Sequence, residues 1–97
     1  MKRIKVDNYE LELVINGMYQ MRNICPAERK SQVDKTILSL LDICDEMKPG
    51  RKKRIRFETG TLSIICRCLI DWRNDKLRHG ELNAVEVINE ALILFAA

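Results

Sequence analysis

One short basic segment occurs twice in this sequence. Lys2-Arg3-Ile4-Lys5-Val6-Asp7 lies near the start, and Lys53-Arg54-Ile55-Arg56-Phe57-Glu58 follows at an offset of 51 residues. Further positions match at the same offset: Leu11 with Leu62, Met18 with Leu69, and Arg22-Asn23 with Arg73-Asn74. A repeat of this kind indicates two copies of one supersecondary unit, so we expect a fold built twice from the same parts.

Each copy of the basic segment alternates apolar and cationic residues. Ile4 and Val6 alternate with Arg3 and Lys5, and the second copy repeats the pattern with Ile55, Phe57, Arg54 and Arg56. A period of two predicts a short strand with one apolar face and one cationic face. Because a two-stranded ribbon is marginal alone, its apolar face should pack on helices.

Two helical patterns follow each predicted strand. The first helix is expected at about 8–24, with Asp7 and Glu10 as a capping box. The second is expected from Ser31 to Lys48, because Ser31 and Asp34 repeat the same capping pattern. Pro49-Gly50 is expected to end this second helix. The third helix opens at Thr59-Gly60-Thr61 and ends near Gly80, and the fourth starts at Asn83 with Glu86 and reaches almost to the C-terminus.

The predicted fold class is mainly α with a small β component. We expect one domain, residues 1–97, made of two strand-helix-helix repeats (1–48 and 52–97) joined by a linker at about 49–51. If a pseudo-two-fold axis relates the repeats, the strands pair as a two-stranded antiparallel ribbon packed on four helices. Arg3, Lys5, Arg54 and Arg56 then share its outer face.

Composition and motifs exclude several classes of protein. A chain of 97 residues is too small for a cleft between lobes, and it lacks a Gly-rich phosphate loop, a nucleophile elbow and a paired-carboxylate signature, so we predict no enzyme. No apolar run approaches the ~20 residues of a membrane span. The four cysteines have no framework spacing and are expected to be reduced thiols in a cytoplasmic protein. Cys66-x-Cys68 points to two sides of a helix, so no metal and no cofactor is predicted.

The basic segments resemble the strand of the ribbon-helix-helix (Arc/MetJ-like) DNA-binding family. Lys2-Arg-Ile-x-Val6 is similar to that strand, and Asn83-Ala-Val-Glu-Val-Ile-Asn-Glu-Ala-Leu92 is similar to the family's second helix; Arg29 to Asp34 is a looser match. The resemblance covers nearly the whole chain as a tandem single-chain duplication. It implies that the ribbon enters the DNA major groove.

Two functions from different classes follow from these features. In the first, the protein is a small DNA-binding regulator of transcription, in which the ribbon contacts bases and the helix starts hold phosphates; the residues expected at the DNA are Arg3, Lys5, Lys52, Lys53, Arg54, Arg56, Ser31 and Asn83. Against this, the ribbon cations could form a solvated face that deters edge-to-edge aggregation. In the second, surplus apolar residues such as Tyr19 and Ile70 make a homodimer or bind a protein partner, as in a phage or mobile-element inhibitor or adaptor.

Overall fold

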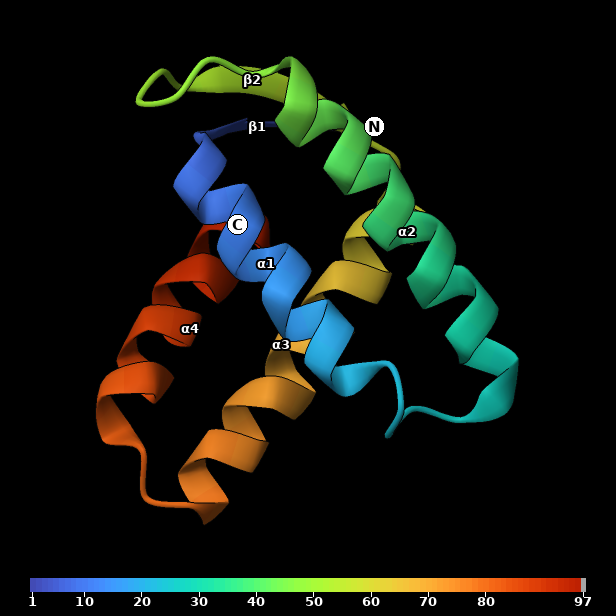
Figure 1. Ribbon diagram of the computed structural model, residues 1–97, viewed down its shortest axis with the longest axis vertical. Helices are drawn as coiled ribbons and strands as arrows, with labels where there is room; N and C mark the ends of the chain where they lie inside the picture. The colour runs from blue at the N-terminus through green and yellow to red at the C-terminus, as the bar shows by residue number, and fades with distance from the viewer. Residues whose placement is uncertain (97) are drawn as a thin grey trace.

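The structure, a computed structural model that describes residues 1–96, confirms the predicted fold class. It is mainly helical, and its elements follow the order strand, helix, helix twice. The elements are β1 (Lys2–Val6), α1 (Asn8–Met21), α2 (Ala27–Glu46), β2 (Lys53–Phe57), α3 (Thr59–Arg78) and α4 (Leu82–Ala96). Figure 1 shows β1 and β2 together at one end of a helical body, although α1 and α2 lie between the two strands in the sequence.

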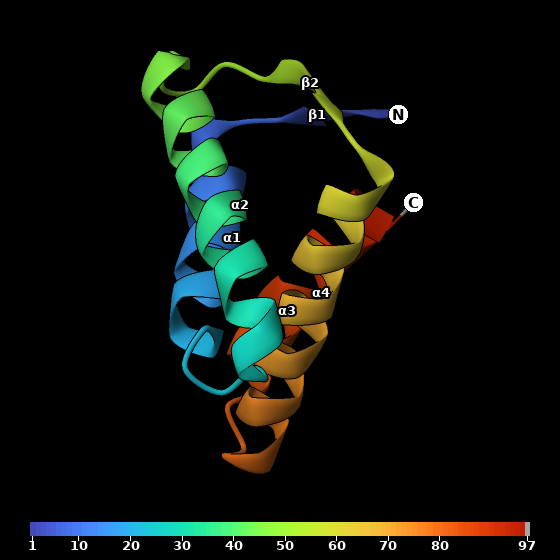
Figure 2. The ribbon, with the colours of Figure 1, turned by 90° about the vertical axis from the view of Figure 1, so that its right-hand side faces the viewer.

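The two strands pair antiparallel, as expected. Ile4 lies opposite Ile55 at the centre, with Arg3 opposite Arg56 on one side and Lys5 opposite Arg54 on the other. Because Ile4 and Ile55 also correspond at the 51-residue offset, the local two-fold axis of the ribbon passes between them. Figure 2 shows the ribbon lying across the ends of the helices, with α1 and α2 below one end and α3 below the other.

A capping box starts α1 directly after the first strand, as predicted. The Asp7 carboxylate accepts a hydrogen bond from the Glu10 backbone N–H at 2.8 Å, and the Glu10 carboxylate accepts from the Asp7 N–H at 3.0 Å. These two bonds satisfy donors that the first turn would otherwise leave free. The helix ends at Met21 rather than near residue 24.

The predicted start of α2 at Ser31 is wrong. The helix begins at Ala27 behind Pro26, which has φ −55°, so Ser31 lies within the second turn. Proline tolerates this place because its missing N–H is not required there. Asp34, expected to support the Ser31 cap, instead accepts two hydrogen bonds from Arg22 at 2.7 and 3.0 Å. This contact joins the end of α1 to α2, and it lowers the pKa of Asp34 below its ordinary value.

The predicted cap at Asn83 is also wrong, because α4 begins one residue earlier, at Leu82. A Schellman motif ends α3: the Glu81 N–H donates to the Lys76 carbonyl at 3.0 Å and the Gly80 N–H donates to the Leu77 carbonyl at 3.1 Å. Gly80 has φ +69°, the left-handed conformation that this motif needs and that glycine adopts without a steric cost. The compact turn leaves Asn83 inside the first turn of α4.

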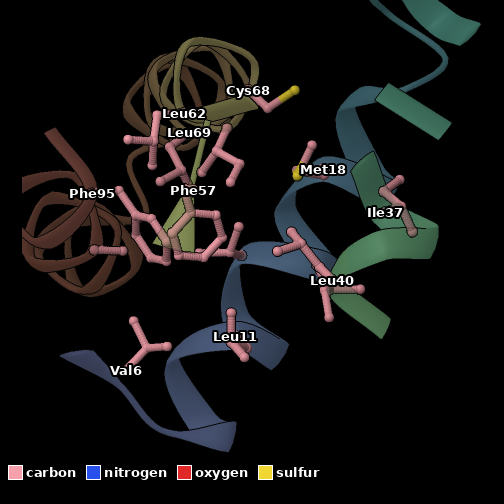
Figure 3. Close-up of a cluster of buried hydrophobic side chains, with 14 of the residues drawn as sticks. Val6, Leu11, Met18, Ile37, Leu40, Phe57, Leu62, Cys68, Leu69 and Phe95 are labelled. Atoms are coloured by element: carbon pink, nitrogen blue, oxygen red, sulfur yellow. The ribbon is translucent and has the colours of Figure 1, made fainter. Parts of the chain in front are cut away.

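The core lies among the four helices and under the inner face of the ribbon. Val6, Leu11, Phe57 and Phe95 are buried there, and the rings of Phe57 and Phe95 meet edge to face with centroids 5.8 Å apart (Figure 3). Much of the apolar surplus expected from the sequence joins this core: Cys68 is buried, and Leu13, Ile64 and Cys66 pack against it partly buried. Tyr19 and Ile70 stay exposed.

Candidate nucleic-acid interface

The outer face of the ribbon carries cations only. Arg3, Lys5, Arg54 and Arg56 are all exposed, while the apolar residue that follows each of them faces the core and is buried: Ile4, Val6, Ile55 and Phe57. The alternation follows from the pleat, which points successive side chains to opposite faces. We call these four exposed cations the ribbon face; the fold brings together all four that the sequence placed there.

The ribbon face sets like charges directly opposite one another. Arg3 faces Arg56, and Lys5 faces Arg54. Directly opposed like charges destabilise a strand pair. Within residues 1–96, none of the four belongs to an ion pair, so no carboxylate relieves the repulsion. An anion bound across the ribbon face would relieve it.

The ribbon has two different ends. At the end formed by Val6 and Lys53, Lys53 is exposed and Lys52 contacts Glu10 at 3.6 Å. At the end formed by Lys2 and Phe57, the next residue is Glu58, which is exposed and makes no side-chain cap on α3. Of the two lysines expected to contact DNA, Lys53 is therefore free for an anion, and Lys52 is partly engaged.

Of the two residues expected to hold phosphates at helix starts, Ser31 lies within α2 and Asn83 lies in the first turn of α4. Ser31 is an exposed residue of the second turn of α2, so its backbone N–H belongs to the helical ladder and offers nothing to a phosphate. The free N–H groups at this end belong to Ala27 and Glu28 instead. Asn83 is exposed in the first turn of α4, beside the tight α3–α4 turn at the foot of the helices in Figure 1, far along the chain from the ribbon.

The linker between α2 and β2 holds two cations that the sequence analysis did not assign to the site. The Arg51 N–H donates to the Lys48 carbonyl at 3.3 Å across Pro49-Gly50, and Gly50 has φ +78°. This is the pattern of a type II β-turn, with proline and then glycine in the central positions. The sequence signal for this arrangement is the Pro-Gly pair between two cations, because such a turn brings its first and fourth residues close together.

Burial disfavours the thiolate form of two of the cysteines, Cys66 and Cys68. Burial raises the pKa of Cys66, and burial together with the nearby Cys25 thiol raises the pKa of Cys68 to about 11, so both stay protonated near neutral pH. No set of three or more histidine, cysteine or acidic side chains in this part of the chain is placed to hold a metal ion.

An apolar hollow lies between α1 and α2, away from the ribbon. It is lined by Ile15, Asn16, Tyr19, Arg22, Asp34, Ile37, Leu38 and Leu41. Tyr19 and Leu38 are each more than half exposed, at 63% and 62%. These two side chains leave apolar surface open to solvent at the hollow.

Comparisons with known proteins add no relative from which a function could be inferred. None of the helices described in residues 1–96 has the length and apolar character needed to cross a membrane. No family model matches the chain, and neither a curated protein nor a solved structure matches it significantly.

Proposed function

We propose that this protein binds double-stranded DNA through the ribbon face and acts as a small transcriptional regulator. The observation that carries the proposal is the pair of directly opposed cations, Arg3 with Arg56 and Lys5 with Arg54, exposed and without a carboxylate partner among the described residues. Such an arrangement costs stability in the free protein. It is understandable where a polyanion binds.

The shape of the ribbon fits the same ligand. The major groove of B-form DNA admits a two-stranded ribbon. In that groove an arginine can donate two parallel hydrogen bonds to the O6 and N7 atoms of guanine, whereas a lysine donates from a single point. Arg3, Arg54 and Arg56 would read bases and also contact the phosphates beside them, and Lys5 would contact a base or a phosphate.

The order of elements supports a relation to ribbon-helix-helix proteins as part of the proposal. The two strands and four helices follow the order that two such protomers would have if they were fused. Leu11 and Leu62, and Val14 and Ile65, are pairs at the 51-residue offset, and all four are buried. In this proposal the single chain supplies both halves of the DNA-binding ribbon.

The direct test compares DNA binding by the wild-type protein and by Arg54→Ala/Arg56→Ala. Fluorescence anisotropy with labelled random-sequence duplexes, repeated over a range of salt concentrations, gives the affinity and its salt dependence. We expect the variant to bind more weakly and its log–log salt slope to fall by about 2, since each lost phosphate contact removes about 0.9. A reduced affinity with an unchanged slope would place these arginines on bases only.

A matched variant controls for the loss of charge alone. Lys35→Ala/Arg67→Ala also removes two exposed cations, from the middle of α2 and of α3. It should bind DNA nearly as the wild type does. Equal binding by the ribbon variant and the wild type would remove the ribbon face from the mechanism, and no binding by the wild type would end the proposal.

Binding of a protein partner is the second candidate function. The apolar hollow between α1 and α2, with Tyr19 and Leu38 exposed on it, favours this role. A second copy of the chain is the simplest occupant to test, by sedimentation of the wild type and of Tyr19→Ser/Leu38→Ser. If the wild type is monomeric and binds DNA, the first function alone is favoured. If it is a dimer that the double variant disrupts, the hollow is an interface.

A further inference from the structure

We infer that the protein sits on DNA in one fixed orientation, because a phosphate clamp of Lys48 and Arg51 flanks only one end of the ribbon. This inference rests on the proposed DNA binding and deepens it. We call the two residues the linker clamp. Its ligand is the phosphodiester backbone beside one half of the bound site.

The β-turn at Pro49-Gly50 builds the linker clamp. In a type II turn the first and fourth Cα atoms lie within about 7 Å, so the turn holds Lys48 close to Arg51. Both residues are exposed, and neither belongs to an ion pair within residues 1–96. Proline fixes one central residue and glycine adopts φ +78° at the other, so the two cations are brought together by a stiff segment.

The surroundings of the linker clamp suit an anion. One hollow is lined by Glu46, Met47, Lys48, Arg51, Lys52 and Lys53, so its lining carries four cations and one carboxylate. Lys52 is already engaged with Glu10, which leaves the other three cations for a ligand. Closely placed cations of this kind attract phosphate through the local field rather than through the small net charge of the chain.

The linker clamp is anchored to the body of the protein. Met47, just before it, is buried, with 7% of its surface exposed. The Asn8 side chain donates a hydrogen bond to the Cys44 carbonyl at 3.1 Å, which joins the last turn of α2 to the start of α1. Beyond the clamp the chain enters β2 directly at Lys53. The clamp therefore has a defined place beside the Val6–Lys53 end of the ribbon, in the segment that joins α2 to β2 in Figure 2.

The opposite end of the ribbon carries a free acid. Glu58 is exposed and its side chain makes no hydrogen bond to α3. Its counterpart at the 51-residue offset, Asp7, is held in the capping box of α1. A phosphate beside the Lys2–Phe57 end would therefore meet one cation, Lys2, together with the Glu58 carboxylate, whereas one beside the other end would meet Lys53 and the linker clamp.

The ribbon face is itself unequal in its two halves. A half-turn about the axis between Ile4 and Ile55 exchanges Arg3 with Arg54 but exchanges Lys5 with Arg56. Arginine offers a planar fork of donors and lysine a compact point charge, so these two positions cannot favour the same base equally. Rotating the protein by 180° on one DNA site would change both the base contacts and the phosphate contacts. One orientation is then preferred.

Footprinting on a selected site tests the inference. Duplexes enriched by the wild-type protein from a library with a randomised core are first sequenced and then probed with hydroxyl radicals on both strands. We expect a site without a palindrome and a footprint that extends further on one side of its centre. Lys48→Gln/Arg51→Gln should lose protection on that side alone, with a salt slope lower by about 2.

The control variant is Lys35→Gln/Arg67→Gln, which removes the same charge from two helices and should leave the footprint unchanged. A palindromic site with a symmetric footprint would overturn the fixed orientation. So would a clamp variant that loses protection equally on both sides or loses none. In these cases binding that still depends on Arg54 and Arg56 would leave the proposed function standing, whereas a wild type that binds no duplex would overturn both.

Discussion

Gly17 of α1 lies against the indole ring of Trp72 in α3. A Cβ atom at residue 17 would lie 2.7 Å from Cζ3 and 2.9 Å from Cδ2 of that ring, and still closer to Cε3. Both residues are buried, so the ring has little room to move away. The contact brings α1 and α3, the first helix of each repeat, close together where they pack.

Gly17→Ala should therefore destabilise the protein even though alanine favours helix. The added methyl group overpacks the α1–α3 contact, which costs about 1–3 kcal/mol, against a gain in helix propensity of about 1 kcal/mol. Denaturant unfolding measures the net loss. Combining the change with Trp72→Leu, which frees space beside residue 17, should give a penalty smaller than the sum of the two single changes.

Gly60→Ala is the matched control for this prediction. Gly60 lies in the first turn of α3, and a Cβ atom there would meet nothing within 4 Å. The change should leave stability the same or raise it by up to about 1 kcal/mol. A stabilising Gly17→Ala would show that the two helices are not held this closely.

The two strand-to-helix junctions should differ in their sensitivity to mutation. Asp7→Ala removes one of the two reciprocal bonds of the α1 capping box and should cost about 1 kcal/mol of unfolding free energy. Glu58→Ala, at the equivalent junction, removes no cap and should change stability little. Equal losses in denaturant unfolding would contradict this difference.

The ribbon and the α1 cap could be predicted from sequence because each depends on local signals. The alternation of apolar and cationic residues predicts that Ile4 and Ile55 lie on the face of the ribbon that packs on the core. Asp7 and Glu10 stand at the spacing of a capping box. The start of α2 was missed because Ser31 and Asp34 imitate that spacing inside a helix, where Asp34 meets Arg22 from another helix. That partner is a tertiary contact, which local spacing does not reveal.

The packing of Gly17 and the closeness of Lys48 to Arg51 could not be predicted from sequence, for related reasons. A glycine within a helical pattern weakens the prediction of a helix, and only the neighbouring Trp72 explains its presence. Pro49-Gly50 predicts the end of a helix, and the same two residues also place Lys48 beside Arg51. In both cases the residues were visible, but their meaning depends on what the fold brings next to them.

Stability should fall at alkaline pH because of Cys68. Its pKa is raised to about 11 from an ordinary 9.0, mainly by burial, so the folded state favours the neutral thiol. The contribution is fully present below about pH 9 and is lost as the pH rises toward 11, at about 1.4 kcal/mol per unit of pKa difference. Comparing wild type with Cys68→Ala at pH 8 and above pH 10 isolates it: the variant's deficit in unfolding free energy should shrink at the higher pH. A constant deficit would contradict the prediction.

Replacements at Arg56 should separate stability from DNA binding. Arg56→Gln removes the repulsion from Arg3, and Arg56→Glu replaces it with an attraction across the strand pair. Each step should raise the unfolding free energy, by about 0.2–1 kcal/mol for the opposite-charge pair. DNA affinity should change in the reverse order, with Arg56→Glu weakest, because a carboxylate then faces the phosphates.

The opposed trends distinguish the two roles that cations on a ribbon can have. If the cations serve only to deter edge-to-edge association, replacing them should leave DNA binding unaffected and should make the protein aggregate at high concentration. Light scattering of Arg56→Gln measures that outcome, and Arg67→Gln on α3 gives the control for loss of one exposed cation. If Arg56→Gln is more stable, remains monodisperse and binds DNA less well, the ribbon face is maintained for its ligand, because the free protein would be more stable without that charge.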